Sequence, residues 1–577
     1  MASDRPRVLV LGGGYVSLYL ARKLGASIEQ GKVDCTIVSR ENFQAFHGFI
    51  GEMLSGRISA SHILSPARRI FSPAQVHVGE IESIDLESST VITSRRLDGK
   101  RTEHHYDQLV VGLGTDDRLD VYPGLAEHGF RLKTYADCFR LRNHILQMFE
   151  LADIEEDPEE RRRLLTFFVA GGGYAGTEIA GELAHLASLL TAKEYRGVRF
   201  EECRFVLVEP GPTIIPELYG RDGSGPGAHP RLVELAMRRQ AELGVEVRTN
   251  TLVTAATPNE VSLSNGERIP ARTIISAVGT KPNPLVERLP FEKDDRGRIV
   301  VDWCLRVPGR PGIWAGGDSA AVPNPRGGGA CPPVAIYAMK HGAKIGSNIA
   351  RGLTGKRPRR FNYPGIGQGA SVGNRYAVAE LQGVEVWGFP AWLVWRSLLT
   401  YYFPSRDQRL RMMADWLIWP IAGRNILEIQ VDRPGDYELR QNRFQPGETI
   451  LTEGEASRYI HVIVEGEVDL IEVADGDAEE PPVLRTLGPG DHFGVRWIES
   501  FGREAARAKT EVRTIALRRD QAPRLQEVLD SAGRLVAESG HFPAITRELE
   551  QAARAGEAST PGLPAGSVSP PSTGADG

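Results

Sequence analysis

Cysteine is scarce in this sequence, with five residues in a chain of 577. Even the closest two, Cys304 and Cys331, lie much further apart than the roughly two to four intervening residues of zinc and redox motifs. This spacing excludes a cysteine-ligated zinc site, and the length of the chain argues against a disulfide framework. We therefore expect buried, inert thiols, no metal site and a reducing compartment.

Long apolar runs and an excess of one charge are also missing. No window approaches the ~20 apolar residues of a membrane-spanning helix, and the N-terminal sequence MASDRPRVLVLGGG has no apolar signal core. The 69 Lys and Arg residues nearly balance the 74 Asp and Glu residues, so no global positive field attracts nucleic acid. We expect a cytoplasmic protein that binds no nucleic acid.

The sequence does have the composition of a folded, multidomain protein. Apolar residues make up 41% and charged residues 25%, and the length suits three or four domains. Strand-like runs at 7–11, 166–170 and 204–208 alternate with helical stretches at 15–24 and 174–190. This alternation predicts an α/β fold with parallel sheets.

The pattern changes near residue 434. Short β segments separated by Pro-Gly, Glu-Gly and Gly-Asp turns follow, and they predict a small all-β barrel. From Gly556 the chain consists mainly of Gly, Ala, Ser and Pro, with almost no large apolar side chains. Such a segment cannot offset its ordering entropy, so we expect a disordered tail.

An internal repeat is the most informative feature. RPRVLVLGGGYVSLYLARKL at 5–24 and LLTFFVAGGGYAGTEIAGEL at 164–183 both read as strand, glycine turn and helix, which predicts two Rossmann-like dinucleotide-binding folds. In the second copy the motif glycines are Gly171, Gly173 and Gly176. The next strand ends in Glu209, which can bind ribose hydroxyls and repel a 2′-phosphate. We expect NAD rather than NADP there.

The first copy departs from this pattern. Gly12 and Gly14 are present, but Ser17 replaces the third glycine and Ser39 stands at the expected acidic position. Serine is only slightly larger than glycine, so close packing can survive. Ribose recognition must differ, and Arg40 can contact a phosphate or adenine instead.

With these motifs the sequence resembles the flavoproteins that have two dinucleotide-binding domains, which implies FAD in the first fold and NAD in the second. SAVGTKPNP at 276–284, with Gly279, is similar to the segment that closes the NAD domain. GIWAGGDSAAV at 312–322 is similar to the second FAD fingerprint, with Gly317 and Asp318. No CxxxxC or CxxC follows the first fold, which sets the disulfide reductases aside.

Within that group, residues 5 to 430 most closely resemble type II NADH dehydrogenases. The resemblance implies an FAD-binding domain at 5–118 and 286–386, an NAD-binding domain with a connecting helix at 119–285, and amphipathic membrane helices at 387–432. The change of pattern and composition described above places the barrel at 433–547 and the tail at 548–577. It also implies that Glu178 is catalytic, beside nicotinamide and flavin. The other interpretation of Glu178 is a partner of the helix dipole.

The segment PPVAIYAMKHG at 332–342 departs from this family. The resemblance places Ala335 and Ile336 at the FAD and quinone site, but Ile336 and Lys340 stand where glutamines are expected. Lys340 can stabilise negative charge on reduced flavin or a quinol anion, and we count it as a second catalytic candidate. It can equally be a solvated helix residue, so the electron acceptor stays open.

Residues 389–425 contain two candidate amphipathic helices. Apolar residues recur at helical spacing: Trp392, Trp395, Leu398, Leu399, Tyr402, Leu410, Met413, Trp416 and Leu417. Five arginines, Arg396, Arg406, Arg409, Arg411 and Arg424, oppose only Asp407 and Asp415. Aromatic faces flanked by arginine suit an anionic membrane surface. The alternative is packing against the flavin domain or against a second subunit of a homodimer.

The segments at 442–473 and 487–494 resemble a cyclic-nucleotide-binding domain. That family follows Phe-Gly with a glutamate for the ribose hydroxyl, where this sequence has Val495. Arg503 and Arg507 lack the small hydroxyl residue that completes the family's phosphate anchor. We therefore expect an interaction or regulatory module rather than a cyclic AMP sensor.

The sequence thus predicts a peripheral flavoenzyme on the inner face of the cell membrane. NADH would reduce FAD, and the electrons would pass to a membrane quinone without proton pumping. One alternative is a soluble NADH-dependent flavoprotein with another acceptor, which Ile336 and Lys340 favour. The other is a redox or nucleotide sensor that signals through the barrel.

Overall fold

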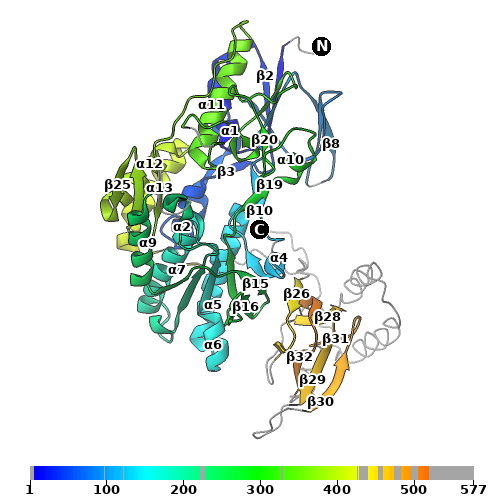
Figure 1. The fold of residues 1–577 in the computed structure, drawn as a ribbon, viewed down its shortest axis with the longest axis vertical. Coiled ribbons are helices and arrows are strands. Elements are labelled where there is room, and N and C mark those ends of the chain that lie inside the picture. Colours follow the sequence, from blue (N-terminus) through cyan, green and yellow to red (C-terminus); the bar gives the residue numbers. More distant parts are fainter. Residues whose placement is uncertain are drawn as a thin grey trace, which may run out of the picture. The chain divides into compact units, whose positions relative to one another are not determined.

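The computed structural model describes residues 5–96, 98–120, 122–220, 228–326, 329–424, 426–427, 440–451, 459–472, 482–494 and 504–518. The chain forms two compact units, Met1–Gln430 and Val431–Gly577 (Figure 1). The tail expected at 548–577 lies outside the described residues. The domain boundaries given above stay predictions.

The first dinucleotide fold is built on a parallel five-stranded sheet. Its strands, in order across the sheet, are β21 (Ile313–Ala315), β9 (Gln108–Val111), β1 (Arg7–Leu11), β2 (Asp34–Ser39) and β5 (Gln75–Val78). Residues 8–11 of β1 are all buried, as in a strand that is covered on both faces. Strand β21 comes from beyond the second fold in sequence, so two distant segments complete this domain.

Helices α1 (Tyr15–Glu29) and α11 (Ala335–Gly352) lie side by side (Figure 1). Their backbones meet at glycines of α11: a Cβ at Gly342 would lie 2.1 Å from the carbonyl oxygen of Val16, and one at Gly346 would lie 2.8 Å from that of Leu20. This register makes the helices parallel. The first two turns of α11 therefore extend past the glycine turn that precedes α1.

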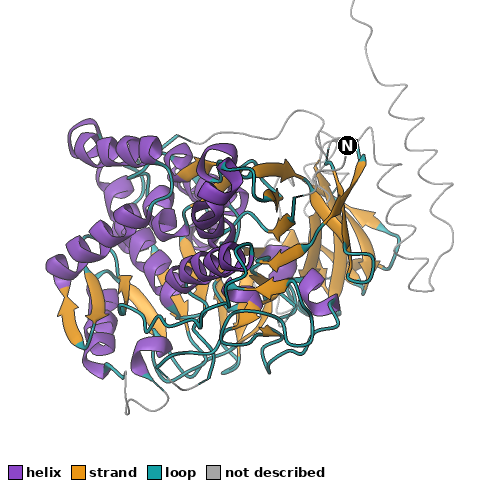
Figure 2. Cartoon of the chain, turned by 90° about the horizontal axis from the view of Figure 1, so that it is seen from above, coloured by secondary structure: helices purple, strands orange, loops and turns teal. Residues whose placement is uncertain are grey.

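The second dinucleotide fold repeats this architecture. Its parallel sheet has the order β11 (Gly129–Phe130), β18 (Thr273–Ser276), β12 (Thr166–Ala170), β13 (Arg204–Val208) and β14 (Val245–Arg248). Helices α5 (Tyr135–Ile154), α7 (Tyr174–Lys193) and α9 (Pro230–Glu242) accompany it. Figure 2 shows the strands as orange arrows flanked by purple helices. The predicted α/β class with two Rossmann-like folds is confirmed.

A small antiparallel sheet leads into the predicted amphipathic segment. It consists of β23 (Gln368–Ser371), β24 (Ala377–Leu381) and β25 (Val384–Trp387), and is followed by α12 (Gly388–Tyr402) and α13 (Arg406–Ala422). Phe403 between the helices is buried, and its ring centre lies 5.0 Å from that of Phe46. The helical pair is therefore anchored on the main unit by aromatic packing.

The second unit is a small antiparallel β domain. One sheet has the order β26 (Arg440–Phe444), β33 (Val512–Arg518), β28 (Tyr459–Glu465) and β31 (His492–Phe493), and the other has β27 (Thr449–Leu451), β32 (Glu504–Ala508), β29 (Val468–Glu472) and β30 (Val483–Leu487). Phe444, Ile463, Val468 and Phe493 belong to its apolar core. The predicted all-β module is confirmed.

Candidate active site

The second glycine turn has the geometry of a pyrophosphate cradle. Gly171 has a φ of +100°, and a Cβ there would lie 2.3 Å from the carbonyl oxygen of Ala277. A Cβ at Gly176 would lie 1.8 Å from the carbonyl oxygen of Gly171, so only glycine fits. Gly173 caps α7, which has no side-chain cap and no acidic residue in its first turn. Its free N–H groups and positive dipole end suit a phosphate.

Glu209 lies at the mouth of this turn, directly after β13. One of its carboxylate oxygens accepts a hydrogen bond from the Gly172 N–H at 2.7 Å, and the other accepts from the Gly211 N–H at 2.9 Å. These two bonds fix the carboxylate at the end of the strand, where the sequence places ribose recognition. Gly279, in the loop between β18 and β19 (Thr280–Pro282), has a φ of +96°.

The first glycine turn accommodates Ser17 in place of the third motif glycine. Gly12 has a φ of +105°, and a Cβ there would lie 2.3 Å from the carbonyl oxygen of Gly112. Ser17 is fully buried, and its hydroxyl donates a hydrogen bond to the Gly12 carbonyl. Gly14 caps α1 without a side-chain hydrogen bond, and the space in front of its Cα is open. This open helix end fits a diphosphate as well as α7 does.

Ser39 and Arg40 have partners within the protein. The Ser39 hydroxyl donates to the Glu41 carbonyl at 2.7 Å, and it would lie 2.1 Å from a Cβ at Gly13. Ser39 therefore packs directly against the turn. Arg40 forms an exposed ion pair with Glu80 at 3.3 Å.

Asp318 stands on the short helix η4 (Gly317–Ser319) after β21. Burial raises its pKa, and the nearby side chains of Lys133 and His47 partly oppose this shift. The Gly317 N–H donates to Nδ1 of His341 at 3.1 Å. His341 is only 2% exposed, and burial lowers its pKa to about 3, so it is neutral. Sequence reasoning missed this histidine, which fixes the fingerprint loop to α11.

Glu178 is the fifth residue of α7, beyond its first turn. This position weakens the helix-dipole interpretation, because the dipole acts mainly within the first turn. Its carboxylate accepts a hydrogen bond from the Ser371 N–H of β23 at 2.9 Å. Burial raises the pKa of Glu178 to about 8, and the carboxylates of Glu182 and Glu52 add to the rise. Glu178 can therefore hold or release a proton near neutral pH.

The residues on α11 occupy different environments. Ala335, its first residue, is exposed, whereas Ile336 packs partly buried against the core of the first fold. The Lys340 ammonium group lies 5.1 Å from the ring centre of Tyr363, within range of a cation–π interaction. Lys340 is thus held against an aromatic ring rather than extended into water.

A buried charge network lies beyond Glu178. Arg396 of α12 donates through both terminal nitrogens to the two carboxylate oxygens of Glu52, on α2 (Ile50–Leu54), and Trp416 donates to the same carboxylate at 3.1 Å. Arg57 pairs with Glu182 at 3.2 Å. Sequence reasoning missed these pairs. The one signal for them was Glu182, which lies one helical turn after Glu178 on the same face of α7.

Helices α12 and α13 border a cavity of about 550 Å³. Five aromatic rings line it, together with four arginines, Arg57, Arg375, Arg396 and Arg409. No aspartate or glutamate is among the described residues that line it. The cavity therefore combines apolar walls with positive charge.

The outer faces of the same helices expose large apolar side chains. They are Phe389, Leu393, Val394, Tyr401, Leu410, Met413, Leu417, Ile418 and Ile421. Leu417 is 75% exposed and Ile421 is 89% exposed, which is unusual for a protein surrounded by water alone. Among the described residues, no helix is both long and apolar enough to span a bilayer.

The expectation that five arginines flank the apolar faces of these helices was wrong for three of them. Arg396 is buried against Glu52, and Arg409 donates at 3.2 Å to the carbonyl of Tyr401 and also to that of Phe403. Of the five arginines, only Arg406 and Arg411 are exposed. Helical spacing identified the helices, but the packing of α12 on the main unit turns the other arginines inward.

In the barrel, Arg507 is exposed on β32 opposite Asp469, while Ala506 and Ala508 on either side lie in the core. Its side chain thus lies on the outer surface. Val495 and Arg503 lie outside the described residues.

Comparison with known proteins identifies the family. The profile of the pyridine nucleotide-disulphide oxidoreductase family matches residues 6–342, more than half of the chain, and that of the NDH2 C-terminal domain matches residues 367–425. The chain is a member of the type II NADH dehydrogenase family. A cyclic nucleotide-binding domain profile also matches residues 441–527. Both resemblances drawn from the motifs are confirmed, and family membership implies FAD and NADH as cofactors.

Relatives of this type II dehydrogenase chain match most of its first unit. The type II NADH:quinone oxidoreductase Ndh of Mycobacterium tuberculosis is 29% identical over 434 residues, 73% of this chain and 89% of the relative. Demethylphylloquinone reductase NdbB of Synechocystis is 28% identical over 431 residues, 73% of this chain and 98% of the relative. The solved NDH2 of Plasmodium falciparum in complex with NADH has the same fold, with a TM-score of 0.66, 16% identity and coverage of 74% of this chain and all of that chain.

Proposed function

We propose that this protein oxidises NADH through FAD and reduces a quinone at the membrane surface, without pumping protons. The observation that carries the proposal is the position of Glu178. Its buried carboxyl group is electrostatically coupled to Glu182 and Glu52, and Glu52 is bonded to Arg396 in the wall of the α12–α13 cavity. A protonatable carboxyl group on the dinucleotide side is thus connected to the cavity through buried charged side chains.

The two glycine turns supply the donor side of this reaction. The open N-terminus of α7 and Glu209 suit NADH, and the open N-terminus of α1 with Asp318 suits FAD. When bound, FAD supplies the chemistry that links a hydride donor to a quinone. The chain's own residues hold the two dinucleotides, and Glu178 holds a proton.

The acceptor side is supported by α12 and α13. Their exposed apolar residues suit the headgroup and acyl boundary of a bilayer, where a quinone is dissolved. Reduction of a quinone to a quinol consumes two protons, and a carboxyl group with a pKa of about 8 can donate one at neutral pH.

The decisive experiment measures NADH oxidation by the purified protein with quinones and with ferricyanide, which takes up no proton. We expect Glu178→Gln to lower turnover with quinone about a hundredfold, as for loss of a general acid, and to leave ferricyanide reduction nearly intact. The matched control is Glu242→Gln at the exposed end of α9. Equal loss with both acceptors would assign Glu178 to NADH or flavin binding instead.

A second candidate is a flavoprotein with a soluble acceptor. Ile336 offers no amide to a quinone carbonyl, and Lys340 is held against Tyr363. The same assay separates the candidates, because rapid turnover with a small redox protein and none with any quinone favours the second. Absence of NADH turnover with every acceptor would favour the sensor hypothesis.

A further inference from the structure

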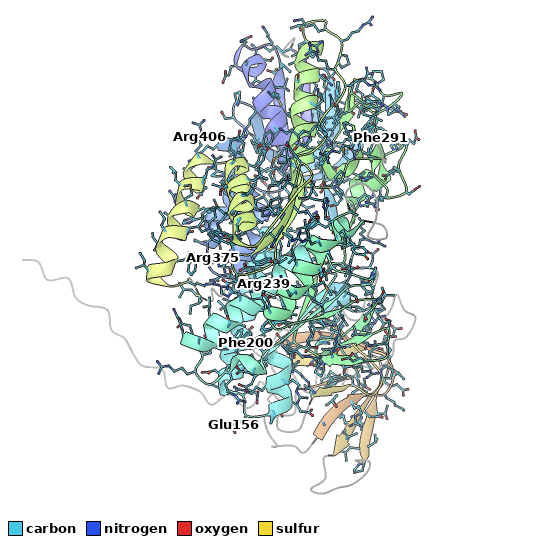
Figure 3. All side chains as sticks on the ribbon, turned by 60° about the vertical axis from the view of Figure 1, so that its left-hand side comes forward. Glu156, Phe200, Arg239, Phe291, Arg375 and Arg406 are labelled. Atoms are coloured by element: carbon cyan, nitrogen blue, oxygen red, sulfur yellow. The ribbon has the colours of Figure 1, made fainter. Side chains whose placement is uncertain are left out.

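Three arginine side chains surround one indole ring at the end of α13. The guanidinium carbons of Arg57, Arg375 and Arg424 lie 5.8, 5.7 and 5.3 Å from the centre of the Trp419 ring. They come from three separate parts of the chain. Arg375 is labelled in Figure 3, beside the helical pair. Like charges gathered at one site repel one another unless carboxylates or another anion neutralise them.

Carboxylates of the described residues neutralise only part of this charge. Arg57 pairs with Glu182, but neither Arg375 nor Arg424 has a carboxylate of the described chain within 4.0 Å. Arg424 donates to the Ser55 carbonyl at 2.8 Å, while its Nε and second terminal nitrogen are buried with no hydrogen-bond partner among the described residues. Within the same part of the chain, the buried Arg57 Nε has no partner either.

The pKa values of two nearby side chains are lowered by the same excess of positive charge. Burial lowers the pKa of Arg424 to about 10 and Arg57 lowers it further, while the carboxylates of Glu182 and Glu52 only partly oppose this shift. Burial also lowers the pKa of His185 to about 3, with added repulsion from Arg57, Arg424 and Arg375. A buried guanidinium N–H without an acceptor is costly, so an anion with several oxygens would stabilise the cluster.

From the geometry we infer that Arg57, Arg375 and Arg424 bind the phosphate of one anionic phospholipid, whose acyl chains lie along the exposed apolar residues of α12 and α13. Guanidinium groups bind phosphate oxygens through paired N–H donors. Arg57 and Arg375 line the cavity, and so do the partly exposed Leu393 and Met413 of the outer face. A lipid can therefore place its phosphate inside and its chains outside. The inference rests on the membrane docking proposed above.

The test is native mass spectrometry of the full-length protein in detergent, titrated with phosphatidylglycerol or with phosphatidylcholine. We expect a saturable one-to-one adduct with phosphatidylglycerol and at least tenfold weaker binding of the zwitterionic lipid. Arg375 is exposed, so Arg375→Gln should fold normally and should weaken the adduct about tenfold, as for loss of a charge-assisted hydrogen bond. Arg375→Lys, which keeps the charge, should restore part of the affinity.

The matched control is Arg406→Gln. Arg406 is exposed at the start of α13, roughly 20 Å along the helix from Trp419, and it does not line the cavity. Equal effects of Arg375→Gln and Arg406→Gln would indicate diffuse surface attraction and would overturn the inference. Competition by glycerol 3-phosphate at the lipid's own concentration would also overturn it, in favour of a soluble phosphate ligand. Adduct formation requires no turnover, so failure of quinone reduction would leave this test valid.

Discussion

Arg396 and Glu52 form a bidentate ion pair between residues 344 positions apart in sequence. Both side chains are largely buried, and the Arg396 guanidinium lies 3.5 Å from the ring centre of Trp416. The pair joins α12 to α2 and, through Trp416, to α13. It therefore fixes the two helices that border the cavity onto the dinucleotide-binding unit.

Removing one partner of this pair should destabilise the protein strongly. Arg396→Met leaves the Glu52 carboxylate buried without its cation, at a cost of about 3–5 kcal/mol in the free energy of unfolding. Denaturant unfolding measures this change. Arg406→Met on the exposed end of α13 is the control and should change stability by no more than ~0.5 kcal/mol. Similar values for both variants would mean that α12 is not anchored by the pair.

Glu178 should give stability a pH dependence. Its pKa is raised from 4.5 to about 8, chiefly by burial, so between these values the folded protein holds a proton that the unfolded chain has released. The free energy of unfolding should therefore fall as pH rises from about 4.5 to 8, and Glu178→Gln should remove this contribution. Unfolding curves across that range, with Glu242→Gln as the control, measure the difference. An unchanged slope in Glu178→Gln would place its pKa near the ordinary value.

Cofactor preference should depend on the charge of Glu209. NADH should exceed NADPH in kcat/KM, and Glu209→Gln should narrow that gap because the repulsion of a 2′-phosphate disappears. Glutamine keeps one oxygen for the N–H groups of Gly172 and Gly211, so the turn should survive better than with serine. Equal kcat/KM values for the two cofactors in the unmutated enzyme would refute this role.

Vesicle binding should depend on the exposed residues of α13. Charge reversal at Arg406 and Arg411 should release the protein from anionic vesicles, and added salt should weaken binding of the unmutated protein. Arg409 is left unchanged because it donates to the carbonyls that end α12. Sedimentation with vesicles measures the bound fraction, and ferricyanide turnover checks the fold. Unchanged sedimentation of the double variant would assign docking to another surface.

The barrel should not bind cyclic AMP or cyclic GMP with micromolar affinity. Val495 stands in the sequence where the resembled family has a glutamate for the ribose hydroxyl. A hydroxyl left unsatisfied costs ~1–3 kcal/mol, which weakens binding roughly 5- to 150-fold. Arg507, one of the two arginines available for a phosphate, is exposed beside core alanines. Calorimetric titration of the full-length protein tests this, and saturable heat at low micromolar nucleotide would contradict it.

Local motifs made the dinucleotide folds predictable. Gly176 and Glu209 act through the glycine turn itself and the next strand, so their spacing in the sequence carries the geometry. Helical periodicity likewise located α12 and α13. It gave one apolar face and could not show that the main unit covers Arg396, because that contact joins residues far apart in the chain.

The charged network was not predictable for the same reason. Glu52, Glu182 and Arg57 look like ordinary surface residues in sequence, and only tertiary packing buries them together. His341 lies at a position where helical spacing gives no functional signal, yet it fixes the loop at Gly317. Side chains that act across domains therefore cannot be predicted from local sequence patterns.

The split of the first sheet also bears on how the chain folds during synthesis. Strand β9 ends at Val111, but its neighbour β21 begins only at Ile313, after the entire second fold. The second fold, whose strands are continuous in sequence, can therefore form first on the ribosome. Until β21 and α11 emerge, β9 presents an open parallel edge and α1 lacks its partner. A chaperone that binds the nascent chain would protect the protein most effectively in that interval.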